Sequence, residues 1–253
     1  MKNKILLVVE GEKTEPKILG SASHGLLSLI GANYEIVSFS NPIYELYDAY
    51  INGEYDDLVS YLRVEKGLKI DDKILSKNAF SSTYLVFDYE PHYQKYSDIK
   101  IKNMLSLFND ETRNGKLYIN YPMVEAYFDI RGFPDYEFNK RMVNLLNFRG
   151  KIYKKEINVN SIISKSRVNV KDMCYIIMQN YCKAKILSND ESYNYDIILN
   201  KQIEEKNLNN RIYVLSTFAL FPMDYNLRKT ISVLKDKLGN DFYVIDNMKD
   251  ICV

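Results

Sequence analysis

Several features that often reveal the function of a chain are missing from this 253-residue sequence. It has no tryptophan, three cysteines (Cys174, Cys182 and Cys252), and no apolar run near the ~20 residues of a membrane-spanning helix. Cys174 and Cys182 lie eight residues apart on an expected helix, which is not a disulfide or zinc spacing, so a reducing compartment is the simplest inference. The first apolar run has five residues, too short for a signal peptide. We therefore expect a cytoplasmic protein with no membrane partner.

The sequence also lacks an excess of charge of either sign. Lys and Arg total 34 against 33 Asp and Glu, and the formal net charge is +1. The overall charge therefore argues neither for nor against a polyanionic partner, and any nucleic-acid site must come from local patches. Apolar residues make up 46% of the chain, which is ordinary for a globular protein and enough for a substantial core.

The most informative stretch is an apolar run that ends in acidic residues. Ile5 to Val9 are all Ile, Leu or Val, as in a strand buried on both faces of a parallel sheet. Glu10-Gly11-Glu12 follows at once, and Thr14 and Pro16 suit the N-cap and first turn of a helix. In open α/β sheets, ligands bind outside the carboxyl ends of the strands, where Glu10 and Glu12 fall.

A second expected strand has the same kind of ending. Residues 82–87 (STYLVF) are followed by Asp88 and Glu90. If the two strands are adjacent in a parallel sheet, their ends lie about 5 Å apart, and carboxylates gathered there repel unless a cation or protons neutralise them. Glu10, Asp88 and Glu90 are therefore candidate ligands of Mg²⁺ or Mn²⁺. The alternative is that the clusters lie far apart along the sheet edge and are merely solvated.

The rest of the chain predicts an α/β fold, with a mostly parallel sheet flanked by helices. An α/β domain is expected over residues 1–130 and 211–253, and a mainly helical insertion over 131–210, where no convincing strand is found. Further strands are expected at 34–40, 116–120, 211–216 and 242–245. Helices are expected at 14–30, 44–66 (one helix, or two broken at Asn52-Gly53), 97–108, 122–127, 170–187, 195–208 and 227–238.

The acidic motifs resemble those of a known family. Glu10-Gly11-Glu12-Lys13-Thr14-Glu15-Pro16 after a first strand, followed later by an acid-x-acid strand end, resembles the Toprim fold of topoisomerases, primases and OLD-type nucleases. The sequence of this first motif is most similar to that of RloB-type proteins, small Toprim-like proteins found among bacterial restriction and phage-defence genes. Those proteins carry an Asn-Pro…Glu segment, which the stretch from Asn120 to Glu125 resembles with Tyr121 interposed. The resemblance covers roughly residues 4 to 130.

The resemblance implies a role for each matched residue. Glu10 corresponds to the catalytic acid or base and Gly11 to its tight turn, while Asp88 and Glu90 correspond to the metal-binding pair. Glu12, Glu15 and Glu125 are accessory acids. The family usually has Asp at the second position of the pair, so the longer Glu90 puts the metal geometry in doubt.

A nucleic-acid substrate requires cations near these acids. Lys13 lies beside the acidic turn, and Lys151, Lys154 and Lys155 form a basic run in which Tyr153 could stack on a base. Such basic groups are more often solvated faces than binding sites, and the other candidates are Lys100, Lys102, Lys165, Arg167 and Lys171. His92 follows the second acidic motif and is either a surface residue or an acid–base group.

The sequence leaves three functional hypotheses. The first is a Mg²⁺- or Mn²⁺-dependent nuclease that hydrolyses DNA or RNA in phage defence. The second is a non-catalytic Toprim-like module that docks on a partner such as a defence ATPase. A phospho-accepting receiver domain is disfavoured, because it is about half this length and requires a Lys strand end that cannot be placed. Whether the protein forms an oligomer is left open.

Overall fold

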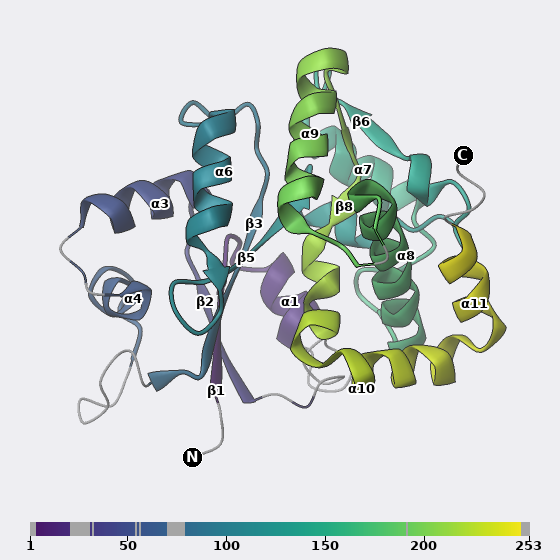
Figure 1. The fold of residues 1–253 in the computed structure, drawn as a ribbon, viewed down its shortest axis with the longest axis horizontal. Coiled ribbons are helices and arrows are strands. Elements are labelled where there is room, and N and C mark those ends of the chain that lie inside the picture. The colour runs from purple at the N-terminus through teal and green to yellow at the C-terminus, as the bar shows by residue number, and fades with distance from the viewer. Residues whose placement is uncertain are drawn as a thin grey trace.

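A computed structural model describes residues 4–20, 31, 33–53, 55, 57–69, 79–190 and 192–248. Its centre is a sheet with the strand order β2-β1-β3-β5-β4, in which β8 also pairs with β5 (Figure 1). The first four strands of that order run parallel, and β4 and β8 pair antiparallel with β5. The strands are β1 (Lys4–Val9), β2 (Asn33–Ser38), β3 (Ser82–Asp88), β4 (Asn109–Asp110), β5 (Gly115–Tyr121) and β8 (Leu215–Ser216). The α/β fold with a mostly parallel sheet flanked by helices is therefore confirmed.

Alternate residues of the central strands enter two different cores. On β1, Ile5, Leu7 and Val9 face one hydrophobic cluster, whereas Leu6 and Val8 face the other. All five are buried, as the unbroken apolar run predicted. The first core is closed by α1 (Thr14–Gly20), α8 (Val170–Ser188), α10 (Phe221–Leu238) and α11 (Asn240–Asp246). The second is closed by α3 (Ile43–Asn52), α4 (Leu58–Lys66), α6 (Asp98–Leu107) and α9 (Tyr195–Asn209).

Most of the expected elements are found, with shifts of a few residues at their ends. The expected helix at 44–66 is two helices, α3 and α4, with Gly53 at the end of the first. Helix α6 begins after Ser97, whose side chain accepts a hydrogen bond from the backbone N–H of Lys100, as an N-cap does. The expected helix at 14–30 is described only as α1, and its remainder lies outside the described residues.

Of three further expectations, one is wrong and two hold only in part. The helix expected from Pro122 is a 3₁₀ helix, η1 (Val124–Phe128), which begins two residues later, after a cis Tyr121–Pro122 bond. Residues 242–245 are not a strand but part of α11, because buried Phe242 and Ile245 share one helical face while Tyr243 and Val244 are more exposed. The strand expected at 211–216 divides into β7 (Arg211–Tyr213) and β8, which pair with different strands.

The region between residues 131 and 210 contains more than the expected helices α8 and α9. A short strand, β6 (Met142–Asn144), pairs antiparallel with β7, and α7 (Gly150–Asn160) precedes α8. The region also contains a 3₁₀ helix, η2 (Phe138–Lys140), and α8 contacts both η2 and a further 3₁₀ helix beyond the region, η3 (Thr217–Leu220). Buried residues of α8 belong to the same hydrophobic cluster as β1 and β3, so this region shares one core with the sheet.

Within the described part of the chain, no helix is both long and apolar enough to cross a membrane.

Candidate functional site

The two acidic strand ends meet at the carboxyl edge of the sheet. Strands β1 and β3 are adjacent and in register, with Val9 opposite Val86. The backbone N–H of Glu10 donates to the Val86 carbonyl at 3.1 Å, and the Asp88 N–H donates to Glu10 Oε2 at 3.0 Å. The side chain of Asp has bonds of about 1.5 Å, so the two carboxyl groups lie within roughly 8 Å of each other. The sequence prediction that these residues come together is confirmed.

The turn after β1 is held by contacts with α1 and β2. The Gly11 N–H donates to Glu15 Oε1 at 3.1 Å, and a Cβ on Gly11 would lie 2.5 Å from Glu15 Oε2. The hydroxyl of Ser38 donates to the Gly11 carbonyl at 2.9 Å. Gly11 therefore allows the buried Glu15 carboxyl to fold back on the turn, while Glu12 stays exposed and accepts a hydrogen bond from the Ser40 hydroxyl.

An open cleft of about 530 Å³ lies over this turn. We call it the acidic cleft, because four carboxyl residues line it: Glu10, Glu12, Glu15 and Glu90. Glu90 adopts a φ of +40°, a backbone conformation that non-glycine residues rarely adopt. Its Oε2 is buried and has no hydrogen-bond partner among the described residues. An orphaned carboxyl oxygen of this kind favours a bound cation or a proton.

The pKa values of these carboxyls show how strongly the site disfavours negative charge. Burial is the main cause that raises the pKa of Glu10 to about 8, and the nearby Glu90 and Glu15 add repulsion. The pKa of the buried Asp88 carboxyl is also raised, first by burial and then by Glu10. Burial likewise raises the pKa of Glu15 and of Glu90. A divalent cation would offset the same desolvation and repulsion.

A buried polar chain from β5, β8 and α8 reaches Asp88, and the sequence analysis did not assign it a role. Asn120 pairs with Asp88 in the sheet register and donates from Nδ2 to Asp88 Oδ1 at 3.4 Å. The Ser216 hydroxyl donates to Asn120 Oδ1 at 2.7 Å, and the Ser216 N–H donates to Asn180 Oδ1 at 2.8 Å. Asn120 could have been predicted to lie near Asp88, because it is a polar residue near the end of β5, the strand next to β3. Ser216 and Asn180 come from distant segments and had no such signal.

Glu125 is a further buried acid near the site. It lies in η1 and is almost fully buried, and its Oε1 lies 3.2 Å from Lys154 Nζ and 3.5 Å from Lys165 Nζ. Its negative charge contributes to the raised pKa of both Glu15 and Asp88. Glu125 is thus close enough to act on the other acids electrostatically, and two lysines accompany it.

The carboxyls present fit a divalent cation only in part. No group of three or more His, Cys, Asp or Glu side chains among the described residues is arranged to hold a metal ion. The converging groups are Glu10 and Asp88, with the orphaned Glu90 oxygen beside them. Mg²⁺ is commonly held by one or two carboxylates with water and substrate phosphate as its other ligands, so this set suits a cation that binds together with a substrate.

The predicted nucleic-acid residues are only partly at the site. Lys13 borders the acidic cleft, and Lys154 reaches Glu125 from α7. Lys151 and Lys155 are exposed on α7, on the same side of that helix as Lys154 by their three- and four-residue spacing.

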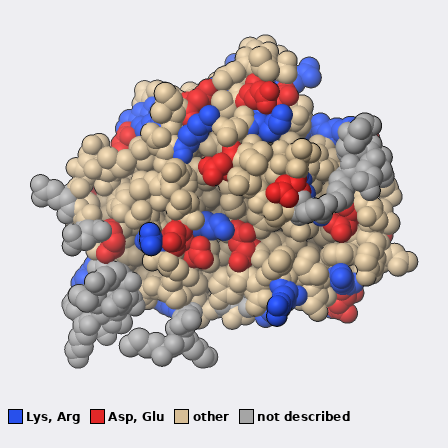
Figure 2. Space-filling model, in the orientation of Figure 1, with Lys and Arg blue, Asp and Glu red and all other residues tan. Residues whose placement is uncertain are grey.

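Tyr153 cannot stack on a base as expected. It is 4% exposed and its hydroxyl donates to Asp129, because the apolar face of α7 packs inward. The side chain of His92 bonds the Leu145 carbonyl at 3.1 Å, and Lys100 pairs with Asp48. The face seen in Figure 2 carries Lys and Arg interspersed with Asp and Glu, without a broad basic surface.

Comparisons of this chain with protein-family models, with curated proteins and with solved structures find no significant match.

Proposed function

We propose that this protein is a Toprim-like, Mg²⁺- or Mn²⁺-dependent nuclease that hydrolyses phosphodiester bonds of DNA or RNA, in a phage-defence role of the RloB type. The observation that supports the proposal is the contact between two strand ends 78 residues apart, in which Glu10 Oε2 accepts a hydrogen bond from the Asp88 N–H. Two carboxyls at the carboxyl edge of a parallel sheet are suitably placed to bind a cation and a phosphate.

Each side chain has a distinct role in the proposed reaction. Asp88 and Glu90 would provide oxygen ligands for the cation, with Glu10 as bridging ligand or general base. Burial raises the pKa of Glu10 to about 8 without metal, and a bound cation would lower it, so that the ionised carboxylate could accept a proton from the attacking water near neutral pH. Asn120 and Ser216 would keep the Asp88 carboxyl in one orientation. When bound, Mg²⁺ supplies positive charge that stabilises the phosphate as negative charge develops on it.

The proposal is tested by incubating the purified protein with single- and double-stranded DNA and RNA, with Mg²⁺, Mn²⁺ or EDTA. We expect metal-dependent cleavage that Glu10→Gln abolishes while the far-UV circular dichroism spectrum is retained. Cleavage that continues in EDTA, or in the Glu10→Gln variant, would reject this assignment.

A second candidate function is a non-catalytic module that docks on a partner such as a defence ATPase. The observation that favours it is that the described acids do not form a three-ligand group and that Glu10 is engaged by the Asp88 backbone. Calorimetry that detects no binding of Mg²⁺ or Mn²⁺, together with retained binding to such a partner, would support this alternative.

A further inference from the structure

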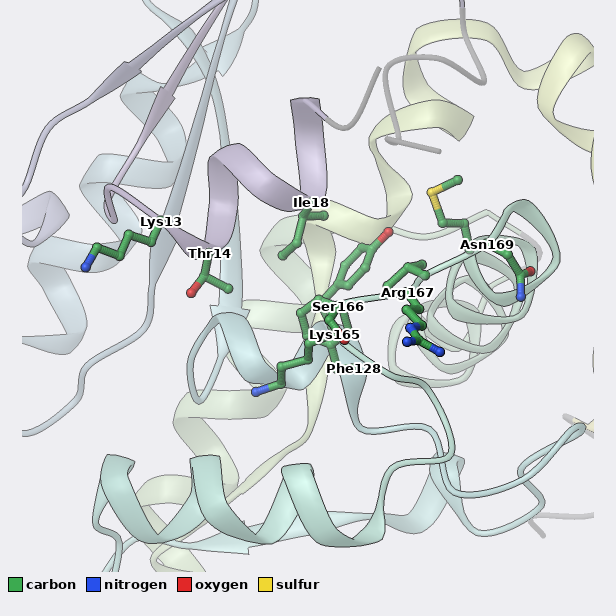
Figure 3. Close-up of a pocket in the computed structure, with 11 residues that line it drawn as sticks. Lys13, Thr14, Ile18, Phe128, Lys165, Ser166, Arg167 and Asn169 are labelled. Carbon is green, nitrogen blue, oxygen red and sulfur yellow. The ribbon is translucent and has the colours of Figure 1, made fainter. Parts of the chain in front are cut away.

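A second cavity, of about 590 Å³, lies beside the acidic cleft and differs from it in chemistry. It is bordered by α1, by η1 and by the segment between α7 and α8, and it includes the first turn of α8 (Figure 3). We call it the basic pocket. Its volume falls within the range of about 300–1,000 Å³ that is typical of small-molecule sites.

The charged residues that line the basic pocket are all cations. They are Lys13, Lys165 and Arg167, and no carboxylate is among its described lining residues. Figure 3 shows that the side chains of Lys165 and Arg167 extend in opposite directions from one segment, and that Lys13 lies apart from both. Arg167 is exposed and has no ion-pair partner among the described residues. Lys165 Nζ is buried and lies 3.5 Å from Glu125 Oε1, so Arg167 is the group available to bind a phosphate inside the pocket.

The remaining wall of the pocket is mostly apolar, and its uncharged polar residues are Thr14, Ser166 and Asn169. Ile18, Phe128 and Met173 contribute apolar surface. Tyr127 also lines the pocket and is 1% exposed, and its hydroxyl has no hydrogen-bond partner among the described residues. That hydroxyl is not accessible from the pocket, so this part of the wall offers a ligand apolar surface, which suits the face of a planar ring. A nucleobase has such a face.

The pocket and the acidic cleft share a boundary. Lys13 and Thr14 line both, and Lys165 of the pocket forms the ion pair with Glu125 of the carboxyl site. A nucleotide in the pocket would thus adjoin the place where a phosphodiester would meet Glu10 and Asp88.

We propose that the basic pocket binds one unstacked nucleotide, with its base against the apolar part of the wall and its phosphate at Arg167. This inference rests on the proposed nuclease function and adds a substrate class to it. A base can reach such a pocket only when it is free of its stacked neighbours, so the substrate would be a single strand, an unpaired end or a flipped-out nucleotide.

The test is a titration of the complete chain in EDTA, where no cleavage interferes, with adenosine 5′-monophosphate, ribose 5-phosphate and adenosine as probes. Calorimetry should detect binding of adenosine 5′-monophosphate. Ribose 5-phosphate and adenosine should each bind at least about ten-fold more weakly, because the first lacks the base and the second lacks the phosphate. Equal binding of ribose 5-phosphate would show that only the phosphate is recognised, and equal binding of adenosine that only the base is. Either result, or no binding of the nucleotide, would overturn the proposal.

Arg167→Glu should weaken nucleotide binding by roughly ten-fold or more, because it replaces a charge-assisted contact with repulsion. Arg113→Glu is the matched control. Arg113 is an exposed residue beside the amino end of β5, at the opposite edge of the sheet, and this variant should bind the nucleotide as the wild type does. Unchanged binding by Arg167→Glu would contradict the proposed phosphate position.

A second arm separates a free mononucleotide from a nucleotide within a strand. A short single-stranded oligonucleotide should compete with the mononucleotide, whereas a blunt duplex of the same sequence should compete weakly. Competition by neither would assign the pocket to free nucleotides and overturn the substrate class. If the mononucleotide binds but no nucleic acid is cleaved with Mg²⁺, the nuclease function fails and the pocket remains. If cleavage occurs but the mononucleotide does not bind, the pocket assignment fails alone.

Discussion

The acidic cleft and the basic pocket lie on either side of the start of α1 and share Lys13 and Thr14, yet their chemistry is opposite. The cleft gathers four carboxyl residues, whereas the described lining of the pocket has three cations and no carboxylate. The net charge of +1 conceals this separation completely. A nearly neutral chain can therefore still have two sites suited to a polyanion. The acidic cleft requires a cation to bind one, whereas the basic pocket already supplies positive charge.

The two sites also differ in how their charged groups are held. Glu10 and Asp88 are fixed by the sheet and by hydrogen bonds from β3 and β5. Arg167 lies exposed on a segment between two helices. We therefore expect substitutions in the cleft to affect chemistry, and substitutions in the pocket to affect substrate binding.

The largest effect is expected from the carboxyls of the cleft. Glu10→Gln and Asp88→Asn should each lower the proposed Mg²⁺-dependent cleavage by about 10³-fold, because each removes a proposed general base or metal ligand. Single-turnover kinetics with saturating substrate measures this. The control is Glu204→Gln, an exposed residue on α9 paired with Lys201, which should cleave normally. Binding of the mononucleotide to the pocket should persist in both cleft variants, and its loss would mean that the two sites are not separate.

A second prediction concerns pH. Glu10 has a pKa of about 8 in the folded protein, against an ordinary value of 4.5. The Glu10 carboxyl therefore stays protonated to a higher pH in the folded state than in the unfolded state. The metal-free protein should therefore lose stability as pH rises from about 4.5 to about 8, because ionising Glu10 in the folded state is unfavourable. The raised pKa of Asp88 acts in the same direction.

Thermal unfolding in EDTA between pH 5 and pH 8.5 measures this effect. Glu10→Gln should flatten the profile, and Mg²⁺ should raise the melting temperature more at pH 8 than at pH 6. A melting temperature that rises with pH across this window would contradict the assignment of a neutral Glu10.

A smaller effect is expected from the polar chain behind Asp88. Ser216→Ala removes the hydroxyl that donates to Asn120 Oδ1 in a fully buried position, which should cost about 1–3 kcal/mol of the free energy of unfolding. Urea denaturation measures the cost. If Asn120 orients Asp88, the affinity for Mn²⁺ should fall as well. Thr230→Ala is a control, since its buried hydroxyl donates to the Pro222 carbonyl on α10 and should cost stability without changing Mn²⁺ affinity.

The smallest effect is expected at the border between the two sites. Lys154→Met removes one of two lysines that accompany the buried Glu125, and Lys154 itself is half exposed, so the expected cost is about 1 kcal/mol. In a Glu125→Gln background the same substitution should cost close to nothing, because the charge that Lys154 accompanies is gone. Equal costs in both backgrounds, measured by urea denaturation, would show that the pair contributes no stability.

The main sheet could be predicted from the sequence because its strands have strong local signals. The run from Ile5 to Val9 is apolar on both faces and is followed directly by Glu10. The run at residues 82–87 is followed in the same way by Asp88. The carboxyl ends of parallel strands lie on one edge of the sheet, so the sequence pattern was enough to predict that Glu10 and Asp88 are close. The short strands β4 and β6 lacked a signal, since two or three residues show no period.

The sequence could not show which basic residues face the acids. Lys151, Lys154 and Lys155 look equivalent in sequence, but in the structure Lys154 is the one of the three that pairs with Glu125. Tyr153 seemed available for stacking because its neighbours are lysines, yet the inward face of α7 buries it. Arg167 and Phe128 meet in the basic pocket through tertiary packing of segments 39 residues apart, which no local pattern reports.

The central claim is that Glu10 and Asp88 share one divalent cation, and anomalous diffraction from a crystal soaked in Mn²⁺ tests it most directly. The account predicts an anomalous peak in the acidic cleft, about 2 Å from a carboxyl oxygen of each residue, which is lost in the Asp88→Asn variant. A wild-type crystal without a peak there, or with Mn²⁺ bound only at exposed carboxylates such as Glu12, would contradict it.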